Sequence, residues 1–412
     1  MKFTQAMLSV DEALSLILST ISPNQTVLSP LLEAVGLISS EVIKSPISLP
    51  TWPNSAMDGY AVISKDIQSA TPRTPVSVEL LSTVPAGSPT NIKVTSGKGV
   101  QIATGGLIPN GADCVVPVEL TSANTSSHVL IKKPVQHGSN IRLAGEDVIA
   151  GTTLVKKNTI ITPAVVSLLA AVGLSSIPVI QRPRVGIAST GNELLRMNES
   201  LSPGKIYDSN AYALMSLVKS MGAIPVWLGM AKDSKRSVSS ILKRGVDLDL
   251  VLTSGGVSKG HLDLVKDVLA DAGCLDFWSI RMRPGKPLVF GKIEYDNNAS
   301  TPYVGLPGNP VSTLVAFEVL VSPAILKMMG VSNLDRPTIQ AKLEDDIYNP
   351  DKRRVFARVS ISKKGSIYYA RLAGPQGSNI ISSFVNADGL AICPEDTVLL
   401  KKGSFAEVRL LK

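Results

Sequence analysis

The spacing of apolar and polar residues predicts a change of architecture along the chain. Residues 9–21 begin with Ser9 and carry Glu12 three positions later, a capping box that leads into an amphipathic helix. From about residue 46 to 145, short alternating runs such as VSVELL and VLIKK are separated by turn residues, which is typical of β-strands. Residues 163–173 return to a helical pattern, with Pro163 in the first turn.

From about residue 184, strand and helix patterns alternate. The strand patterns are RVGIAST, IPVWLG and DLVLTS, and helical runs such as NAYALMSLVKSMG and SKRSVSSILKRG separate them. This alternation predicts a doubly wound α/β domain, with a parallel sheet and helices on both faces. The apolar stretch 311–329 contains Glu318 and Pro323 and is short for a membrane span, so we expect a buried helix there.

These patterns divide the chain into four predicted parts. They are a helical and linker domain (1–46 and 146–180), an inserted β-rich domain (47–145), the α/β domain (181–330) and a C-terminal small β-barrel domain (331–412). A length of 412 residues agrees with roughly two to four domains. With 44% hydrophobic and 18% charged residues, the chain has enough apolar side chains to fill their cores.

Charge and cysteine content narrow the partners and the compartment. A net charge of +8 favours anionic partners and leaves nucleic acid, membrane surfaces and phosphorylated small molecules open. The three cysteines are far apart, which does not suit a disulfide framework and favours a reducing compartment. With only three histidines, any metal is expected to be bound by oxygen. We expect no signal peptide, no membrane and a cytoplasmic location.

Several loops are candidates for an anion-binding site. The loop 251–263 (VLTSGGVSKGHLD) joins a strand to a helix, where glycine backbone N–H groups and the helix N-terminus can hold a phosphate. A glycine-rich turn without a ligand explains this loop equally well. However, loops 189–194, 281–287 and 305–312 also follow strands, and ligands of open α/β sheets bind at that edge. Four such loops, which bear Glu193, Asp263, Arg283 and Lys286, indicate a site.

Two alternative enzyme classes lack their required residues. Residues 256–260 (GVSKG) match the GxSxG motif of serine hydrolases. That class needs a histidine well downstream of the serine, and the only histidine after Ser258 is His261, too near in sequence to serve as the base. No GxxxxGK[ST] motif is present, so a P-loop NTPase is also unsupported.

The β-rich region contains three further polar strings with ordinary explanations. Asp58-Gly59, within PNSAMDGYA (53–61), is more often a hairpin turn than a catalytic pair. Residues 102–117 can be a series of turns around a strand, and Glu146 and Asp147 can lie in a solvated loop. Taken singly, none of these strings defines a function.

Taken in order, the strings resemble one family. NSAMDGYA, ATGG with a later GADCVV, RLAGED, STGNEL, TSGGVS, RPGKP and GLPGNPVS have the order and spacing of the molybdopterin molybdenumtransferases, which include the C-terminal domain of gephyrin. The resemblance covers nearly the whole chain, including the ending GPQGSNIISSFVNADGLAICPED. It implies an enzyme that hydrolyses adenylylated molybdopterin, releases AMP and inserts molybdate at the dithiolene. It also implies dependence on Mg²⁺.

The resemblance implies roles for particular residues. The functional acids, which would also be the metal ligands, are Asp58, Glu193, Asp233 and Asp263, together with the functional Thr104. The substrate-binding residues are Ser254, Gly255, Gly256, Ser258, Arg283, Lys286, Pro307 and Pro310. Arg283 and Lys286 would be the cations for phosphate or molybdate. Hydrolysis of an anhydride needs the charge on its oxygens neutralised, and carboxylate-held Mg²⁺ and fixed cations do this without a nucleophilic side chain.

The resemblance also implies partners and leaves rivals to consider. We expect a homodimer with a composite site to which the β-rich insert of one subunit contributes Asp58, and a molybdopterin adenylyltransferase as the upstream partner. Lys259, His261 and Asn192 depart from the commonest family pattern without removing a functional acid. A receptor-clustering scaffold is disfavoured because all four acids are retained, and the adenylyltransferase is disfavoured because it lacks the outer β domains. No nucleic-acid-binding motif accompanies the positive charge.

Overall fold

The computed structural model describes residues 7–125, 127–256, 268, 273–295 and 299–411. It divides into two compact units. Unit 1 comprises residues 1–28, 36–40 and 178–412, and unit 2 comprises residues 29–35 and 41–177. The strands β1 (Thr26–Pro30) and β12 (Ser176–Ile180) lie where the chain passes between the units. Each unit is described by itself below.

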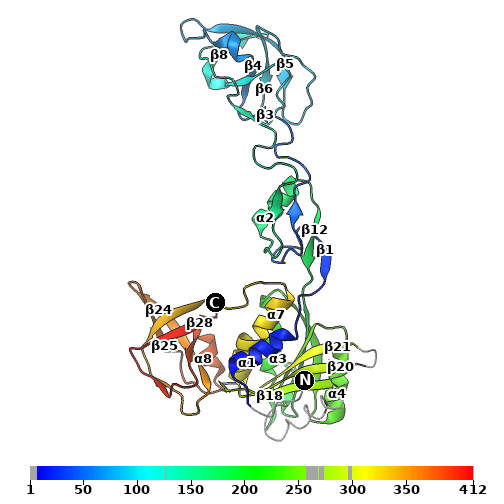
Figure 1. Cartoon of the computed structure of the whole chain (residues 1–412), viewed down its shortest axis with the longest axis vertical. Helices are drawn as coiled ribbons and strands as arrows, with labels where there is room; N and C mark the ends of the chain where they lie inside the picture. The colour runs from blue at the N-terminus through cyan, green and yellow to red at the C-terminus, as the bar shows by residue number, and fades with distance from the viewer. Residues whose placement is uncertain (1–6, 126, 257–267, 269–272, 296–298, 412) are drawn as a thin grey trace. The chain divides into compact units, whose positions relative to one another are not determined.

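Unit 2 is built on a six-stranded sheet with the order β7-β4-β6-β5-β9-β8. Figure 1 labels β4, β5, β6 and β8 of this sheet. Its strands are β4 (Gly59–Val62), β5 (Val76–Val84), β6 (Lys98–Ile102), β7 (Cys114–Pro117), β8 (Thr121–Thr125) and β9 (His128–Ile131). Valine and isoleucine side chains form two apolar clusters in the unit. The predicted β-rich insert is therefore a folded β domain.

Shorter elements complete unit 2. They are the strands β2 (Ile43–Lys44), β3 (Asn54–Ser55), β10 (Ile141–Arg142) and β11 (Thr153–Val155), the 3₁₀ turns η1 (Ser64–Ile67) and η2 (Val118–Leu120), and the helix α2 (Pro163–Ala171). The Thr162 side chain accepts a hydrogen bond from the Val165 N–H at the start of α2. Pro163 occupies the first turn, where its missing N–H costs nothing.

The α/β part of unit 1 has a six-stranded sheet with the order β16-β13-β17-β21-β20-β18. The strands are β13 (Arg184–Thr190), β16 (Ile224–Ala231), β17 (Leu250–Ser254), β18 (Gly273–Ser279), β20 (Pro287–Glu294) and β21 (Ser300–Leu306). The strands of this sheet run parallel except for β20, which is antiparallel to both of its neighbours. The sheet is mixed rather than wholly parallel because β20 is reached through short connections, which cannot make a parallel crossover.

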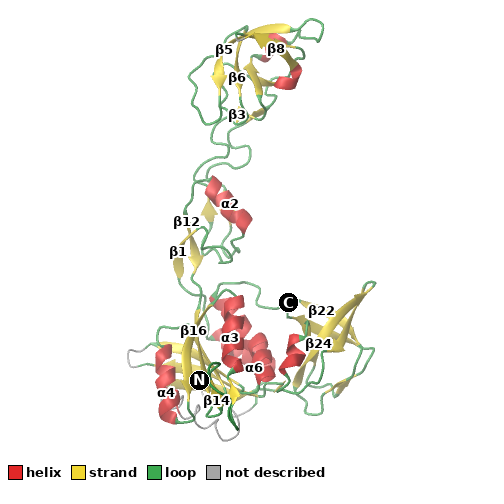
Figure 2. Cartoon of the chain, turned by 180° about the vertical axis from the view of Figure 1, so that it is seen from behind, coloured by secondary structure: helices red, strands yellow, loops and turns green. Residues whose placement is uncertain are grey.

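Helices cover both faces of this sheet. Leu250 and Leu252 of β17 join the apolar cluster that also contains residues of α1 (Val10–Ser19) and α3 (Ser209–Ser220), whereas Val251 joins the cluster that contains α4 (Lys235–Leu242). Figure 2 shows α3 and α4 on opposite sides of the sheet. Because side chains alternate across a strand, an apolar run buried on both faces is the pattern expected of a doubly wound domain. The predicted fold class is confirmed.

The most apolar segment forms one helix of the core. The helix α6 (Pro310–Ala316), the π-helical turn η4 (Phe317–Val321) and the helix α7 (Ser322–Met328) run together from Pro310 to Met328. This helix is long and apolar enough to cross a membrane, but 83% of its most apolar window is buried inside the protein. The prediction of a core helix at 311–329 is confirmed.

Small elements border the α/β core. They are the paired strands β14 (Leu194–Leu195) and β15 (Ile206–Tyr207), the 3₁₀ turn η3 (Lys243–Gly245) and the strand β19 (Met282–Arg283). β19 pairs with the C-terminal barrel rather than with the central sheet. The predicted helix after residue 260 falls mostly outside the described residues.

The C-terminal residues form a closed β-barrel. Its strands are β22 (Thr338–Leu343), β24 (Arg354–Lys364), β25 (Ile367–Leu372), β26 (Gly389–Cys393) and β28 (Phe405–Leu410). The order β24-β25-β22-β28-β26 is closed by pairing between β24 and β26. The pair β23 (Ile347–Tyr348) and β27 (Leu399–Leu400) and the helix α8 (Ile381–Val385) complete the domain. Closure leaves no free edges among these five strands.

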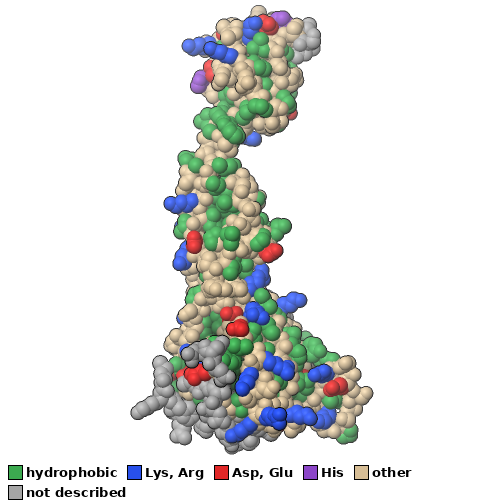
Figure 3. Space-filling view, turned by 90° about the vertical axis from the view of Figure 1, so that its right-hand side faces the viewer, with side chains coloured by type: hydrophobic (Ala, Val, Ile, Leu, Met, Phe, Trp, Pro, Cys, Tyr) green, Lys and Arg blue, Asp and Glu red, His purple; other side chains and the backbone are tan. Residues whose placement is uncertain are grey.

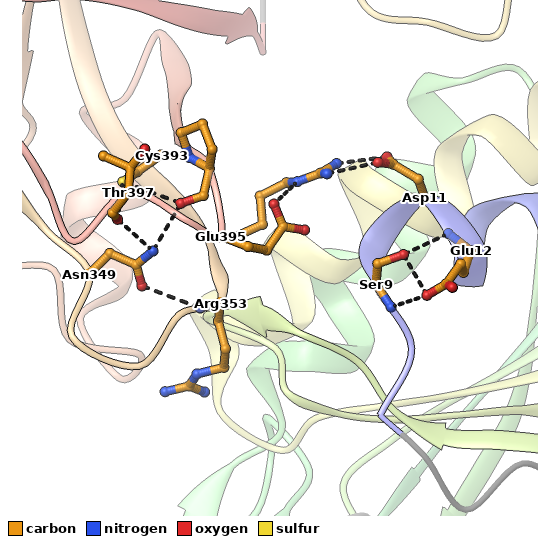
Figure 4. Close-up of polar contacts among 10 residues, drawn as sticks. Ser9, Asp11, Glu12, Asn349, Arg353, Cys393, Glu395 and Thr397 are labelled. Atoms are coloured by element: carbon orange, nitrogen blue, oxygen red, sulfur yellow. Dashed lines mark hydrogen bonds and ion pairs between the residues drawn. The ribbon is translucent and has the colours of Figure 1, made fainter.

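The N-terminal helix connects the barrel to the α/β part of unit 1. Ser9 and Glu12 form the predicted capping box at the start of α1 (Figure 4). Asp11, in the same turn, accepts two hydrogen bonds of 2.7 Å from the Arg354 guanidinium of β24, which also bonds Glu395. The guanidinium lowers the pKa of Asp11. These contacts link two segments that are more than three hundred residues apart.

Candidate functional site

A pocket lies at the carboxyl edge of the central sheet in unit 1. The strands β13, β17 and β21 end side by side, with Ser189 opposite Ser254 and Ser254 opposite Leu306. The pocket at these ends has a volume of about 510 Å³. Five of the residues predicted from the sequence line it: Glu193, Ser254, Gly255, Pro307 and Pro310. These five residues therefore lie together at the strand ends.

Glycine is required at the turn after β17. Gly255 has a φ of +88°, and a Cβ atom there would lie 2.4 Å from the Thr190 carbonyl oxygen. A Cβ atom on Gly308 would lie 3.5 Å from the Cα of Gly255, so the loops after β17 and β21 are close together. Gly256 follows with a φ of +70° and is half-buried. The missing side chains let backbone form the wall of the pocket.

One amide ties three walls of the pocket together. The Asn210 Nδ2 group, at the start of α3, donates to Ser254 Oγ at 2.6 Å and to the Gly308 carbonyl oxygen at 2.8 Å. The Ser254 hydroxyl also lies 3.4 Å from the Pro307 carbonyl oxygen, to which it donates. Asn210 thereby fixes the two predicted substrate-binding loops to a helix that the sequence analysis did not connect with them.

The two prolines shape the loop that leads into the core helix. Pro310 is the first residue of α6 and has no N–H to leave unpaired. The Pro307 carbonyl oxygen accepts a hydrogen bond from Thr313 Oγ1, in the first turn of α6. The Val311 N–H donates to the Ser378 carbonyl oxygen at 3.1 Å. The loop between β21 and α6 is thus fixed by a side-chain hydrogen bond from Thr313 and by a backbone hydrogen bond to Ser378.

Glu193 and Asp233 lie on adjacent loops and have different surroundings. Glu193 lines the pocket, and its carboxylate folds back over Gly191, where a Cβ atom would lie 2.5 Å from Oε2. Asp233 Oδ2 accepts a hydrogen bond from the Asn192 N–H at 3.1 Å, and the Asp233 N–H donates to Asn192 Oδ1 at 3.3 Å. Asp233 is not part of the pocket wall, so its contacts with Asn192 position the loop that carries Glu193.

Asp58 and Thr104 come together in unit 2. Asp58 is exposed and accepts hydrogen bonds from the Thr104 N–H at 2.6 Å and from Thr104 Oγ1 at 2.8 Å. These two bonds lower the pKa of Asp58 and stabilise its ionised form. The two residues are 46 positions apart, yet both were expected to be functional. The structure brings them into direct contact.

The predicted cations lie near a second pocket, at the barrel. Arg283 lines this pocket of about 390 Å³, donates to the Tyr348 carbonyl oxygen, and lies 3.7 Å from an Asp351 carboxylate oxygen. Lys286 is exposed and helps to lower the pKa of Asp351, after the stronger effects of Arg353. Neither cation lines the pocket at the sheet edge.

Arg358, which the sequence analysis did not select, lines the barrel pocket. It is 1% exposed, and burial lowers its pKa to about 10. Its guanidinium donates to Ser383 Oγ at 3.0 Å and to the carbonyl oxygens of Pro375 and Gly377 at 3.0 and 3.1 Å. Within the described ranges no carboxylate pairs with it. A buried cation held by neutral groups is suited to an anion.

The described residues do not by themselves form a magnesium site. Within the described parts of the chain, no three His, Cys, Asp or Glu side chains lie close enough to hold a metal ion. Glu193 and Asp233 belong to unit 1 and Asp58 to unit 2, while Asp263 and Ser258 lie outside the described residues. The carboxylate donors suit Mg²⁺ chemically.

Comparison with known proteins covers nearly the whole chain. The MoeA N-terminal region (domain I and II) matches residues 8–173, the probable molybdopterin binding domain matches residues 186–327, and the MoeA C-terminal region (domain IV) matches residues 340–411. The chain is 39% identical to molybdopterin molybdenumtransferase 2 of Mycobacterium tuberculosis, over 92% of this chain and 93% of that protein. This chain belongs to the MoeA family.

Other members agree in sequence and structure. Molybdopterin molybdenumtransferase of Haemophilus influenzae is 34% identical over 95% of each chain. The crystal structure of the molybdopterin biosynthesis MoeA protein of Pyrococcus horikoshii has a TM-score of 0.84 and 31% identity, and the match covers 99% of this chain and 100% of that one. The MoeA-family chain is thus a transferase of molybdenum cofactor biosynthesis, as its sequence motifs predicted.

Several polar residues that line the sheet-edge pocket were not predicted from the sequence. Thr190, Asp208 and Asn210 all line the sheet-edge pocket. Asp208 lies immediately before α3 and accepts from the Ala211 N–H, so its sequence position indicates only a helix cap. The string YDSN (207–210), directly before a helix in an α/β domain, was the available signal. Arg358 had no comparable signal because it lies within an ordinary strand.

Proposed function

We propose that this chain hydrolyses the phosphoanhydride of adenylylated molybdopterin and transfers molybdate to the dithiolene. Water attacks phosphorus, the bridging P–O bond breaks, and the hydrolytic step yields AMP, molybdopterin with its own terminal phosphate, and two protons at neutral pH. In the transfer step the two dithiolene sulfurs bind molybdenum and displace one oxo ligand, which leaves as water with the two thiol protons. The observation that supports this most strongly is the 510 Å³ pocket within the molybdopterin-binding region, with Glu193 in its wall and the glycine turns of β17 and β21 side by side.

The backbone of the sheet-edge pocket suits the phosphates. Gly255 and Gly308 bring main chain close to a ligand, and the core helix that starts at Pro310 directs its N-terminus at the same loop. Glu193, held over Gly191, orients the attacking water and accepts its proton in our proposal. Asn210 keeps the two loops at a fixed separation, so that the reacting groups need little reorganisation.

The barrel pocket suits molybdate. Molybdate is a dianion, and Arg358 and Arg283 place two guanidinium groups in the lining of this pocket. Arg358 stays charged at neutral pH, because its pKa remains at about 10 despite burial. We propose that Arg283, Arg358 and the exposed Lys286 bind molybdate before its transfer.

We propose further that the reaction requires Mg²⁺ and a homodimer. Asp58 and the carboxylates of unit 1 would provide oxygen ligands, and the Asp58–Thr104 pair of one subunit would complete the site of its partner. We also propose a molybdopterin adenylyltransferase as the donor of substrate. The buried free thiols of Cys114 and Cys393 are compatible with the cytoplasmic location that we propose.

The experiment that tests the reaction is direct. Purified protein is incubated with adenylylated molybdopterin, with and without molybdate and with Mg²⁺ either supplied or removed by EDTA. AMP release and the metal content of the pterin are then measured. We expect both to require Mg²⁺. Full AMP release in EDTA would contradict the metal requirement, and no AMP release under any condition would contradict the reaction.

Mixed dimers test the composite site. Asp58→Ala and Asp263→Ala should each be inactive alone. When the two are unfolded and refolded together in equal amounts, about half of the dimers are mixed, and each mixed dimer has one site with both aspartates intact. Roughly a quarter of the wild-type activity should therefore return. Verified mixed dimers without activity would confine Asp58 to its own subunit.

A further inference from the structure

Asp208 is a buried carboxylate with one oxygen left for a ligand. It is 5% exposed and lines the sheet-edge pocket. Its Oδ1 accepts the Ala211 N–H at 3.1 Å as the N-cap of α3, while Oδ2 has no hydrogen-bond partner among the described residues. A buried carboxylate oxygen without a donor is costly, because it has lost its water and gained nothing in return.

A second unpartnered group faces the same pocket. Thr190 is 3% exposed, lines the pocket, and its Oγ1 has no hydrogen-bond partner among the described residues. None of the described residues that line the pocket is a lysine, arginine or histidine. No side chain of the described wall therefore compensates the charge of Asp208. A donor group on a ligand can do so.

The hydrogen-bonding capacity of Asp208 determines which part of a ligand it can bind. An ionised carboxylate only accepts hydrogen bonds, whereas phosphate and molybdate offer mainly acceptors. The phosphates of the substrate are therefore repelled from this wall. A pterin carries an N3–H and a 2-amino group side by side, a planar fork of donors that resembles the guanidinium fork of arginine. Oδ2 accepts one of these donors, and Oδ1, which has a second lone pair beside the Ala211 N–H, accepts the other. Two parallel donors compensate a buried carboxylate better than one ribose hydroxyl does.

We propose that Asp208 recognises the pterin ring of the substrate through its N3–H and 2-amino donors. Thr190 Oγ1, on the neighbouring strand end, takes a further polar atom of the same ring. This assignment rests on the proposed function. It fixes the orientation of the substrate in the pocket, with the pterin at the α3 side and the phosphates at Gly255 and Gly308.

Asp208→Asn tests the proposal with little disturbance of the helix. Asparagine is as good an N-cap as aspartate, so the Ala211 N–H keeps its acceptor, while a donor replaces Oδ2. Binding of 6-hydroxymethylpterin, followed by its fluorescence, should weaken roughly 10- to 100-fold, because a charged hydrogen bond becomes a clash of donors. AMP binding, followed by calorimetry, should change less than about 3-fold because AMP lacks the pterin fork.

A change of ligand preference separates recognition from a structural role. In 6-hydroxymethyllumazine an oxo group replaces the 2-amino group, so the amide donor that Asp208→Asn introduces should now find an acceptor. The ratio of pterin to lumazine affinity should therefore fall in Asp208→Asn relative to wild type. An unchanged ratio with unchanged pterin affinity would overturn the proposal. A loss confined to AMP or to Mg²⁺ binding would also overturn it, and would assign Asp208 to the ribose or to the metal.

Two further measurements keep the outcome unambiguous. Asp208→Ser also preserves the N-cap and removes Oδ2, so it replaces the first variant if that variant does not fold. AMP release from adenylylated molybdopterin by the wild type is measured in parallel. If the wild type releases AMP while Asp208→Asn and Asp208→Ser keep wild-type pterin affinity, only the role of Asp208 is wrong. If the wild type neither releases AMP nor binds the pterin, both the proposed function and this inference are wrong.

Discussion

Two pockets of unit 1 differ in the charge of their described walls. The described wall of the sheet-edge pocket contains Glu193 and Asp208 and no cationic side chain, whereas Arg283 and Arg358 line the barrel pocket. The net charge of +8 belongs to the whole chain, and on the face drawn in Figure 3 lysine and arginine side chains lie on both units. Total charge therefore does not say which pocket holds the cations. In our proposal backbone dipoles bind the phosphates in one pocket, and guanidinium groups bind molybdate in the other.

We expect the largest effect when the Glu193 carboxylate is removed from the sheet-edge pocket. Glu193→Ala should lower the rate of AMP release about 10²–10³-fold, because a group that acts in the transition state is lost while no core contact is removed. Glu199→Ala is the matched control, since Glu199 is an exposed acid of the same segment that does not line the pocket. Asp263→Ala should behave like Glu193→Ala. Near-normal turnover of Glu193→Ala at saturating Mg²⁺ would remove Glu193 from the mechanism.

The second effect tests the barrel pocket. Arg358→Lys keeps a positive charge but loses the planar fork that bonds Ser383, Pro375 and Gly377, so molybdate affinity should fall about 10-fold. Equilibrium dialysis with labelled molybdate measures this change, and pterin binding at the sheet-edge pocket should stay constant. Arg371→Lys, on the exposed side of the barrel, is the control. If Arg358→Lys weakens pterin and molybdate equally, the two pockets do not have separate roles.

The third effect concerns the backbone wall of the sheet-edge pocket. Gly255→Ala forces a side chain onto a φ of +88° and against the Thr190 carbonyl oxygen, which should cost roughly 2–4 kcal/mol of stability. Gly204→Ala has a similar φ of +78° but meets nothing within 4 Å, so it should cost only about 1 kcal/mol. Thermal unfolding of the two variants gives the comparison. Equal costs would show that the close approach at Gly255 is not strained.

The smallest effect concerns Asp58, which lies in neither pocket. Thr104→Val removes the Oγ1 donor and leaves the N–H, so the lowered pKa of Asp58 should rise toward its ordinary value. In the wild type, the lowered pKa of Asp58 stabilises the folded state at pH values above the pKa of the unfolded state, and this stabilisation is lost as the pH falls through the folded-state pKa. Thr104→Val should therefore be less stable than wild type at neutral pH and nearly as stable as wild type in acid. Carbon-detected NMR titration measures the pKa. An unchanged value would mean that the backbone N–H alone sets it.

Ser258 gives a separate test of the hydrolase alternative. In the proposed reaction no serine nucleophile is needed, so Ser258→Ala should keep most of its activity. Reaction of the wild type with a fluorophosphonate, or complete loss of turnover with unchanged substrate affinity, would restore that alternative.

Local patterns predicted most of the individual elements. The capping box of Ser9 and Glu12, the N-terminal Pro163 of α2 and the alternating strands and helices after residue 184 appear as expected. These features depend on residues a few positions apart, so periodicity and turn chemistry are sufficient to find them. The reversed direction of β20 was not predicted, because a strand pattern carries no sign of the direction in which the strand will pair.

The sequence by itself determined the order of the elements, the glycine and proline loops at the strand ends, and the membership of the MoeA family. Only the tertiary structure decided which side chains share a pocket. In the folded chain Asn210 donates hydrogen bonds to Ser254 and Gly308, and Asp208 lines the same pocket. Arg283 lines a different pocket, together with Arg358. The physical reason is that backbone conformation depends on near neighbours, whereas burial and unpaired hydrogen-bonding groups depend on segments that meet only after folding.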